Sequence, residues 1–117
     1  DIHHMIGVGT VSGLMALSAN RLAGVGGGWS VWKDGRELAV VELPIAGLMS
    51  DAPAEEVAAK AAAMVQAMAD CGCHLNNAYM QHSLLALVVI PDLRISDLGL
   101  VDVRKFELVQ ALKSTYP

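Results

Sequence analysis

Apolar residues recur every three or four positions in the middle of the chain, and this spacing predicts a helix from about Ser50 to Asp70. Ser50 and Asp51 are residues that commonly cap a helix N-terminus, and Pro53 suits a first helical turn. Gly72 follows as the expected stop. The predicted buried stripe of this helix consists of Val57, Ala61, Met64, Val65 and Met68.

Two β-compatible runs flank Asp34-Gly35, a dipeptide that strongly predicts a two-residue hairpin turn. The expected strands are 29–33 and 36–42. Cross-strand neighbours in a hairpin pack against each other, so the register decides which side chains form the apolar face. Counting back from the turn, the expected apolar pairs are Val31 with Leu38 and Trp29 with Val40.

The N-terminal part reads as a strand over 2–8 and then a helix that begins near Thr10 and ends at the glycines of 24–28. Its predicted buried positions are Leu14, Met15, Ser18, Ala19, Leu22 and Val25. The strand and the helix are joined by glycines at 7, 9 and 13. Their spacing is one residue too long for a dinucleotide-binding fingerprint, so we interpret them as a turn.

The C-terminal part predicts a nearly continuous buried strand over 82–90, a strand around 93–95 and a strand over 100–103. The last ten residues fit neither a strand nor a helix period. The order strand, helix, hairpin, helix and further strands indicates an α+β fold. We expect one domain over residues 1–117, with a mixed, mostly antiparallel sheet flanked by helices in a two-layer sandwich.

Composition limits the classes of partner. Of 117 residues, 54% are hydrophobic and 17% are charged, which excludes a disordered tail and predicts apolar surface that an absent neighbour covers. The net charge is −4 without a basic run, so neither nucleic acid nor an anionic membrane is an expected partner. The chain starts at Asp1 inside a predicted strand, and we expect it to be a segment of a longer protein.

Candidate chemistry is sparse. Cys71 and Cys73 are too close in sequence for an unstrained disulfide and have no second pair, so we predict reduced thiols in a cytosolic protein. His3 and His4 are neighbours on a predicted strand and point to opposite faces, which keeps them from sharing a metal. His74 and His82 complete the four histidines, and no His-x-His motif is present. We therefore predict no metal ligand and no cofactor in this segment.

Several collinear segments resemble the C-terminal domain of bacterial adenine deaminase, a member of the amidohydrolase superfamily. The opening Asp1-Ile2-His3-His4 is similar to that family's Asp-Ser-His-Asn, with Ile2 and His4 replacing Ser and Asn. The other matching segments, in the family's order, are Gly26-Gly27-Gly28, Lys33-Asp34-Gly35, 43–51 (LPIAGLMSD), Cys71-Gly72-Cys73, 83–91 and 99–103.

The resemblance implies that the parent enzyme converts adenine and water to hypoxanthine and ammonia. It implies a binuclear Mn or Fe centre in a preceding (β/α)8 barrel, where the metal activates the water. This segment would pack on the barrel, shape the mouth of the site and supply no metal ligand. His3 is the one candidate for a role in the site, with Asp1 as its orienting partner. The resemblance implies a cytoplasmic protein with a purine substrate and leaves homo-oligomerisation open.

An alternative hypothesis is a free-standing α+β binding or regulatory module without a catalytic role. The apolar composition argues against it, because a lone domain of this size rarely needs so much hydrophobic surface.

Overall fold

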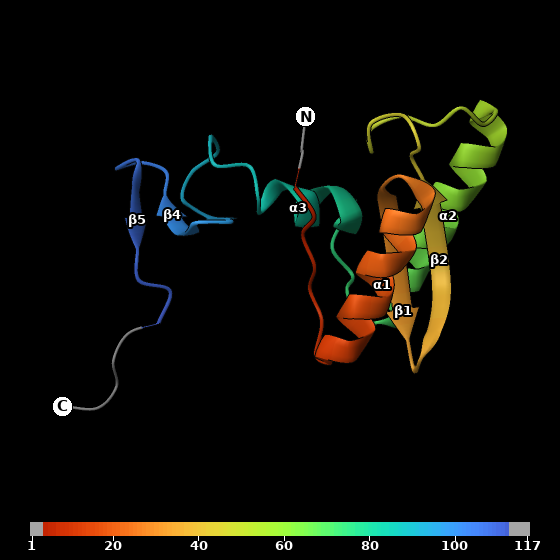
Figure 1. The fold of residues 1–117 in the computed structure, drawn as a ribbon, viewed down its shortest axis with the longest axis horizontal. Coiled ribbons are helices and arrows are strands. Elements are labelled where there is room, and N and C mark those ends of the chain that lie inside the picture. The colour runs from red at the N-terminus through yellow and green to blue at the C-terminus, as the bar shows by residue number, and fades with distance from the viewer. Residues whose placement is uncertain (1–3, 113–117) are drawn as a thin grey trace.

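The computed structural model describes residues 4–112, in which helices and strands are arranged as an α+β fold, as predicted (Figure 1). The predicted single sheet is not found there, because the described strands form two separate antiparallel sheets. One sheet pairs β1 with β2, and the other has the order β3-β4-β5. The elements are α1 (Ser12–Val25), β1 (Gly28–Lys33), β2 (Arg36–Glu42), α2 (Ala54–Asp70), α3 (Ala78–Leu84), β3 (Leu93–Ser96), β4 (Gly99–Asp102) and β5 (Glu107–Val109).

The hairpin β1-β2 forms around the predicted turn. Asp34 and Gly35 have φ angles of 52° and 76°, the two positive values that define a type I′ turn. The predicted register is wrong beyond the turn, because a β-bulge shifts the pairing between Val31 and Trp32. The observed apolar pairs are Val31 with Ala39 and Trp29 with Val41, each one position from the predicted partner.

Helices cover both faces of this hairpin. On one face, the side chains of β2 and the loop after it pack with Met64 and Ala67 of α2, and Val41 and Met64 are each only 1% exposed. On the other face, α1 contacts β1, and the hydroxyls of Ser18 and Ser30 form a hydrogen bond. Because successive strand residues point to opposite faces, the hairpin is the middle layer of a helix–sheet–helix arrangement.

Both long helices are confirmed, with adjusted N-termini. The second predicted helix begins at Ala54, with Pro53 at the N-cap position. Ser50 makes no cap bond to the helix; its Oγ accepts a hydrogen bond from the Ala52 N–H at 3.1 Å. Gly72 follows α2 with a φ of 90°, as expected of a helix stop.

The predicted strand over 82–90 is wrong. Ala78–Leu84 forms α3, and turns follow in which Leu87 N–H donates to Leu84 O and Ile90 N–H donates to Leu87 O. Leucine and alanine dominate 84–87 and favour helical turns over strands, whereas the β-branched residues come only at 88–90. A continuous apolar run does not by itself distinguish a buried strand from a buried helix.

The N-terminal strand prediction is also corrected where the structure describes it. Residues 4–9 contain no strand, and residues 1–3 lie outside the described part. This segment lies alongside α1 and leads into it (Figure 1). It is therefore extended chain that is paired with neither described sheet.

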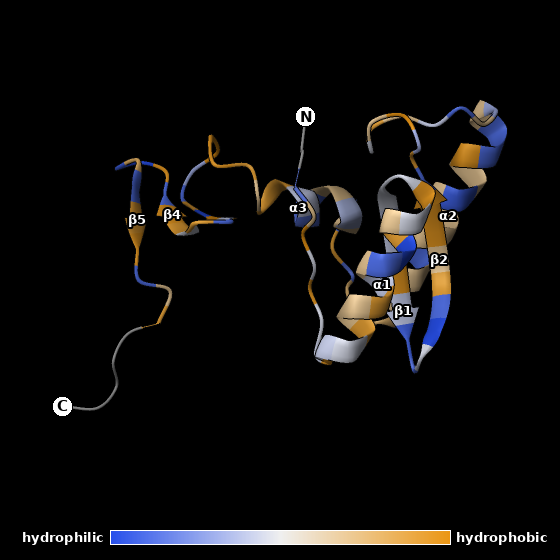
Figure 2. Cartoon of the chain, in the orientation of Figure 1, coloured by the Kyte–Doolittle hydropathy of each residue, from blue (hydrophilic) through white to orange (hydrophobic). Residues whose placement is uncertain are grey.

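The sheet β3-β4-β5 lies at the far end of the molecule from the hairpin (Figure 1). Its connection to the rest includes one backbone bond from Ile95 N–H to Leu85 O at 2.8 Å. The strands at 93–96 and 99–102 agree with the sequence prediction, and 107–109 adds a third. Hydrophobic residues lie along this region and along the hairpin (Figure 2). Large apolar side chains exposed around the far sheet are Leu93, Ile95, Leu98, Phe106, Leu108 and Leu112.

Candidate functional site

A hollow of about 530 Å³ lies beside β1, between the two helical layers. Its walls come from residues 4–8, α1, β1, the loop after β2, α2 and α3. No Asp, Glu, Lys or Arg side chain lines it. Such a lining disfavours a charged metabolite, because no lysine or arginine is present to neutralise a phosphate or carboxylate.

Two aromatic side chains meet in this hollow. The ring centroids of Trp29 on β1 and Tyr79 on α3 are 4.9 Å apart, with the ring planes at 48°. Such tilted pairs contribute about 0.5–1.5 kcal/mol beyond the area that they bury. The pair fixes α3 against the edge of the hairpin sheet.

His82 also lines the hollow, from the same helix as Tyr79. Its Nε2 is buried and has no hydrogen-bond partner among the described residues. Burial lowers the pKa of His82 below its ordinary value of 6.5, because the apolar surroundings disfavour the imidazolium. The ring is therefore neutral at pH 7, with one nitrogen that still needs a partner.

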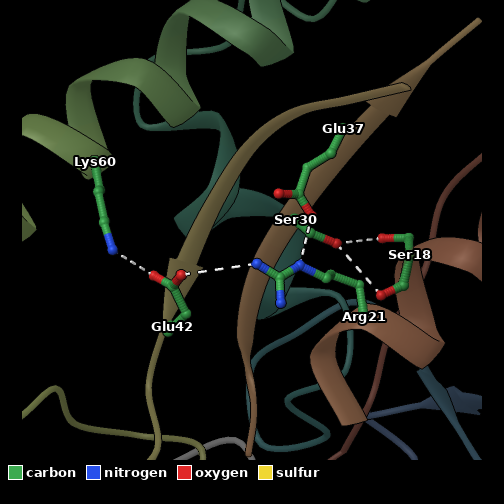
Figure 3. Close-up of polar contacts among 6 residues, drawn as sticks. All are labelled: Ser18, Arg21, Ser30, Glu37, Glu42 and Lys60. Carbon is green, nitrogen blue, oxygen red and sulfur yellow. Dashed lines mark hydrogen bonds and ion pairs between the residues drawn. The ribbon is translucent and has the colours of Figure 1, made fainter. Parts of the chain in front are cut away.

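A cluster of charged residues lies on the other side of the hairpin, at β2 (Figure 3). Arg21 Nε on α1 donates to Glu37 Oε2 at 2.9 Å, and Arg21 Nη2 lies 4.0 Å from Glu42 Oε1. Lys60 Nζ on α2 donates to Glu42 Oε2 at 2.7 Å. The Lys60 bond holds the pKa of Glu42 below 4.5. Glu42 thus connects both helices across β2.

The residues selected from the sequence are not gathered into one site. Asp1 and His3 lie outside the described residues, so the predicted pairing of these two side chains stays a prediction. His4 lines the hollow, whereas His74 is exposed. Cys71 and Cys73 are free thiols, as predicted.

Metal-binding groups are not clustered in the described part of the chain. Between residues 4 and 112, no three His, Cys, Asp or Glu side chains are placed to hold a metal ion. No helix in that range is long and apolar enough to cross a membrane.

The hollow was not foreseen from the sequence, although Trp29 was assigned to an apolar face. Tyr79 and His82 were placed in a connector and a strand, and only the helix over 78–84 turns both toward β1. The sequence signal that could have indicated this helix is the spacing of Tyr79 and His82. They are three residues apart, as neighbours on one helix face are.

A protein-family model described as the adenine deaminase C-terminal domain matches residues 1–107. Adenine deaminase of Ruegeria pomeroyi is 75% identical over 113 residues, which cover 97% of this chain and 19% of that protein. Adenine deaminase of Roseobacter denitrificans is 73% identical, with the same two shares. Adenine deaminase of Moorella thermoacetica is 47% identical over 96% of this chain and 19% of that protein. The chain spans about a fifth of the length of these relatives.

Proposed function

The chain belongs to the adenine deaminase C-terminal domain family, and from this premise we propose that it is the non-catalytic C-terminal domain of an adenine-deaminase-like hydrolase. In this proposal the parent enzyme hydrolyses the exocyclic C–N bond of adenine, a cyclic amidine, and releases hypoxanthine and ammonia. The observation that carries the proposal is the family match over residues 1–107, together with relatives named adenine deaminase at up to 75% identity.

The metal chemistry of the proposed parent belongs outside this chain. The histidines, cysteines and carboxylates described between residues 4 and 112 do not fit a binuclear Mn or Fe centre, because no three of them gather at one point. We therefore assign the metal to the parent's (β/α)8 barrel and derive no hydrolytic step from the residues of this segment.

The role that we propose for this domain, residues 1–117, is to pack on the barrel and shape the mouth of its site. The apolar side chains exposed on the far sheet support this role, since clusters of that kind mark protein–protein contacts. The uncharged hollow beside β1 gives further surface suited to contact with protein. We also propose that the predicted larger mixed sheet forms only when the rest of the parent is present.

We keep His3 as the candidate site residue, with Asp1 orienting its imidazole. The support is the alignment of Asp1-Ile2-His3-His4 with the family's Asp-Ser-His-Asn. A neutral imidazole can donate a hydrogen bond to a purine nitrogen or hold a loop, while a carboxylate on its other nitrogen fixes the tautomer. We propose in addition a cytoplasmic enzyme of purine catabolism, able to form homo-oligomers.

The test is an assay of the purified full-length parent on adenine and a panel of related purines. We expect the parent to release hypoxanthine and ammonia from adenine. We also expect it to contain Mn or Fe and to lose activity when a chelator removes the metal. If the parent deaminates another purine faster than adenine, the proposed substrate is wrong and that purine replaces it. A parent with no deaminase activity in the metal-loaded state would contradict the proposal and favour the alternative of a non-catalytic module.

A further inference from the structure

The described sheet β1-β2 has two strands, although helices cover both of its faces. A two-stranded sheet is marginally stable on its own, and an unpaired edge is a template for another strand. The two edges of this hairpin differ. Lys60, Glu42 and Arg21 gather around β2, whereas no charged side chain lines the hollow beside β1.

The backbone of β1 offers hydrogen-bonding groups at that uncharged edge. Leu43 N–H donates to Gly27 O, and a two-residue turn makes Lys33 and Arg36 a bonded pair. Backbone groups alternate in direction along an antiparallel strand. Ser30 and Trp32, which lie between those bonded positions, therefore direct their N–H and C=O groups away from β2.

The hollow of about 530 Å³ runs along this edge rather than over one face. It touches the consecutive residues Gly27 to Val31, whose side chains alternate between the two faces of the sheet. It is also lined by α1, from one face, and by α2, from the other. A space bordered by a strand edge and by both covering helices has the position of a neighbouring strand.

Two buried polar atoms near this edge lack partners among the described residues. They are Nε1 of Trp32, on β1 itself, and Nε2 of His82, in the wall of the hollow. A buried polar group without a hydrogen bond costs about 1–3 kcal/mol, so such groups in a folded protein are normally satisfied. Of the two side chains, only His82 lines the hollow, so its Nε2 is the atom that a polar group in this space would satisfy. The backbone N–H and C=O groups of a further strand are polar groups of that kind.

We propose that the outer edge of β1 pairs with a strand supplied by the part of the parent enzyme outside this sequence. The inference rests on the proposed function in that the chain is taken as one domain of a longer enzyme. The chain spans 19% of its relatives, so most of the parent is available to supply the strand. The uncharged lining requires the side chains of this strand to be apolar or small and neutral.

The segment 4–9 of the chain itself is the competing occupant. It was predicted as a strand over 2–8, yet residues 4–8 line the same hollow without pairing with β1. Space therefore separates this segment from β1. The incoming strand would fill that space and turn β1 from an edge strand into a central strand.

Hydrogen exchange on the full-length parent, resolved to single amides, tests the proposal. The amides of Ser30 and Trp32 are expected to exchange at least about 100-fold more slowly than the amide of Val40, because paired amides exchange only when the structure opens. Val40 is the internal control: it lies opposite Ser30 and directs its N–H to the outer edge of β2. Equal rates at the three amides would overturn the proposal.

Two variants identify the occupant. Ile6→Pro removes an N–H from the segment 4–9, and Ile6→Ala is the matched control that only shortens the side chain. If the Ser30 amide exchanges slowly in both Ile6→Pro and Ile6→Ala, and does so at every protein concentration, the pairing strand comes from elsewhere in the parent. Protection lost only in Ile6→Pro would assign the edge to the segment 4–9, and protection lost on dilution would assign it to a second copy. Either result would overturn the proposal.

If Ile6→Pro unfolds the protein, a structure of the full-length parent identifies the neighbour of β1 directly. Adenine turnover on the same preparation reports the proposed function separately. Protected Ser30 and Trp32 amides in a parent that leaves adenine unchanged would contradict the function and leave the strand pairing standing.

Discussion

Trp29 on β1 and Tyr79 on α3 form a tilted aromatic pair with ring centroids 4.9 Å apart, and this pair joins the short third helix to the hairpin sheet. Tyr79 is only half-buried. Replacing it by Ala should therefore lower the free energy of unfolding by about 2 kcal/mol, less than the 3–5 kcal/mol typical of fully buried aromatics. Tyr79→Phe keeps the ring and should be close to neutral. Urea titration followed by tryptophan fluorescence measures both, and equal losses in the two variants would contradict the ring contact.

His82 should make stability depend on pH. Its folded pKa is lowered by burial, so below pH 6.5 the unfolded state binds more protons than the folded state. Stability therefore falls as the pH drops through 6.5 and stops falling below the folded pKa. His82→Gln should flatten this decline between pH 7.5 and 5.5, whereas His74→Gln, at an exposed histidine, should leave it unchanged. Unfolding titrations at several pH values measure the slope, and an unchanged slope in His82→Gln would contradict the assignment.

The Glu42 carboxylate should stabilise the fold in the opposite pH range. Its folded pKa lies below 4.5, mainly because Lys60 donates to it, so its contribution is complete above pH 4.5 and is lost as the pH falls through the folded pKa. Glu42→Gln should lower the melting temperature at pH 7, and the difference from the unmodified chain should shrink toward pH 3. Added salt should also reduce it, since the cluster is partly exposed.

Glu55→Gln is the control for Glu42→Gln. Glu55 is exposed in the first turn of the same helix that carries Lys60, and none of the ion pairs found between residues 4 and 112 includes it. The two variants remove the same charge. A melting temperature that falls equally in both would mean that net charge, rather than the bridge between α1 and α2, stabilises the fold.

Gly35→Val should destabilise the hairpin by about 1 kcal/mol or more. Gly35 has a φ of 76°, a conformation that a β-branched residue resists, and no atom lies within 4 Å of the position that a Cβ would occupy. The loss would therefore come from the backbone conformation and not from a clash. Gly35→Asn is the matched control, because asparagine tolerates this region better and should cost less. Equal stability of the Val variant would mean that the turn relaxes without cost.

Local patterns were sufficient for the elements whose signals lie within a few residues. The turn at Asp34 and Gly35 and the stop at Gly72 follow from backbone preferences, and the helical period placed Met64 in the core. The same period was wrong for Val65, which is exposed, and it missed the buried Ala67.

The predicted register was wrong because counting back from the turn assumes no bulge, whereas Leu38 is an extra residue on β2 between the partners of Val31 and Trp32. Residues 84–87 failed because an apolar run has no period that separates a helical turn from a strand.

The candidate site was harder to predict than the elements. The hollow takes its walls from six segments, and its centre is the unpaired edge of β1, which no local pattern reveals. The contacts of Tyr79 and His82 depend on α3, an element that was predicted as connector and strand. The position of the unsatisfied His82 nitrogen in the wall of the hollow could not be predicted from sequence spacing, because burial is a property of the assembled fold.

His3 is the residue of this segment through which we expect the domain to affect chemistry, and His3→Ala in the full-length parent tests this. If its imidazole contacts the substrate or holds a loop over it, turnover of adenine should fall roughly tenfold or more, as loss of one positioned polar group often does. Metal content and melting temperature should be unchanged. Asp1→Asn should give a smaller loss, because the amide still holds the ring but no longer favours one tautomer.

The competing role for His3 is a hydrogen bond between the domain and the barrel. In that case His3→Ala would lower the melting temperature while turnover per folded molecule stays intact, so both quantities are measured on the same preparation. His74→Ala is the control, because His74 is an exposed histidine outside the hollow and should alter neither quantity. Full activity with full stability in His3→Ala would exclude the residue from both roles. The match of Asp1-Ile2-His3-His4 to the family's opening would then carry no role for His3.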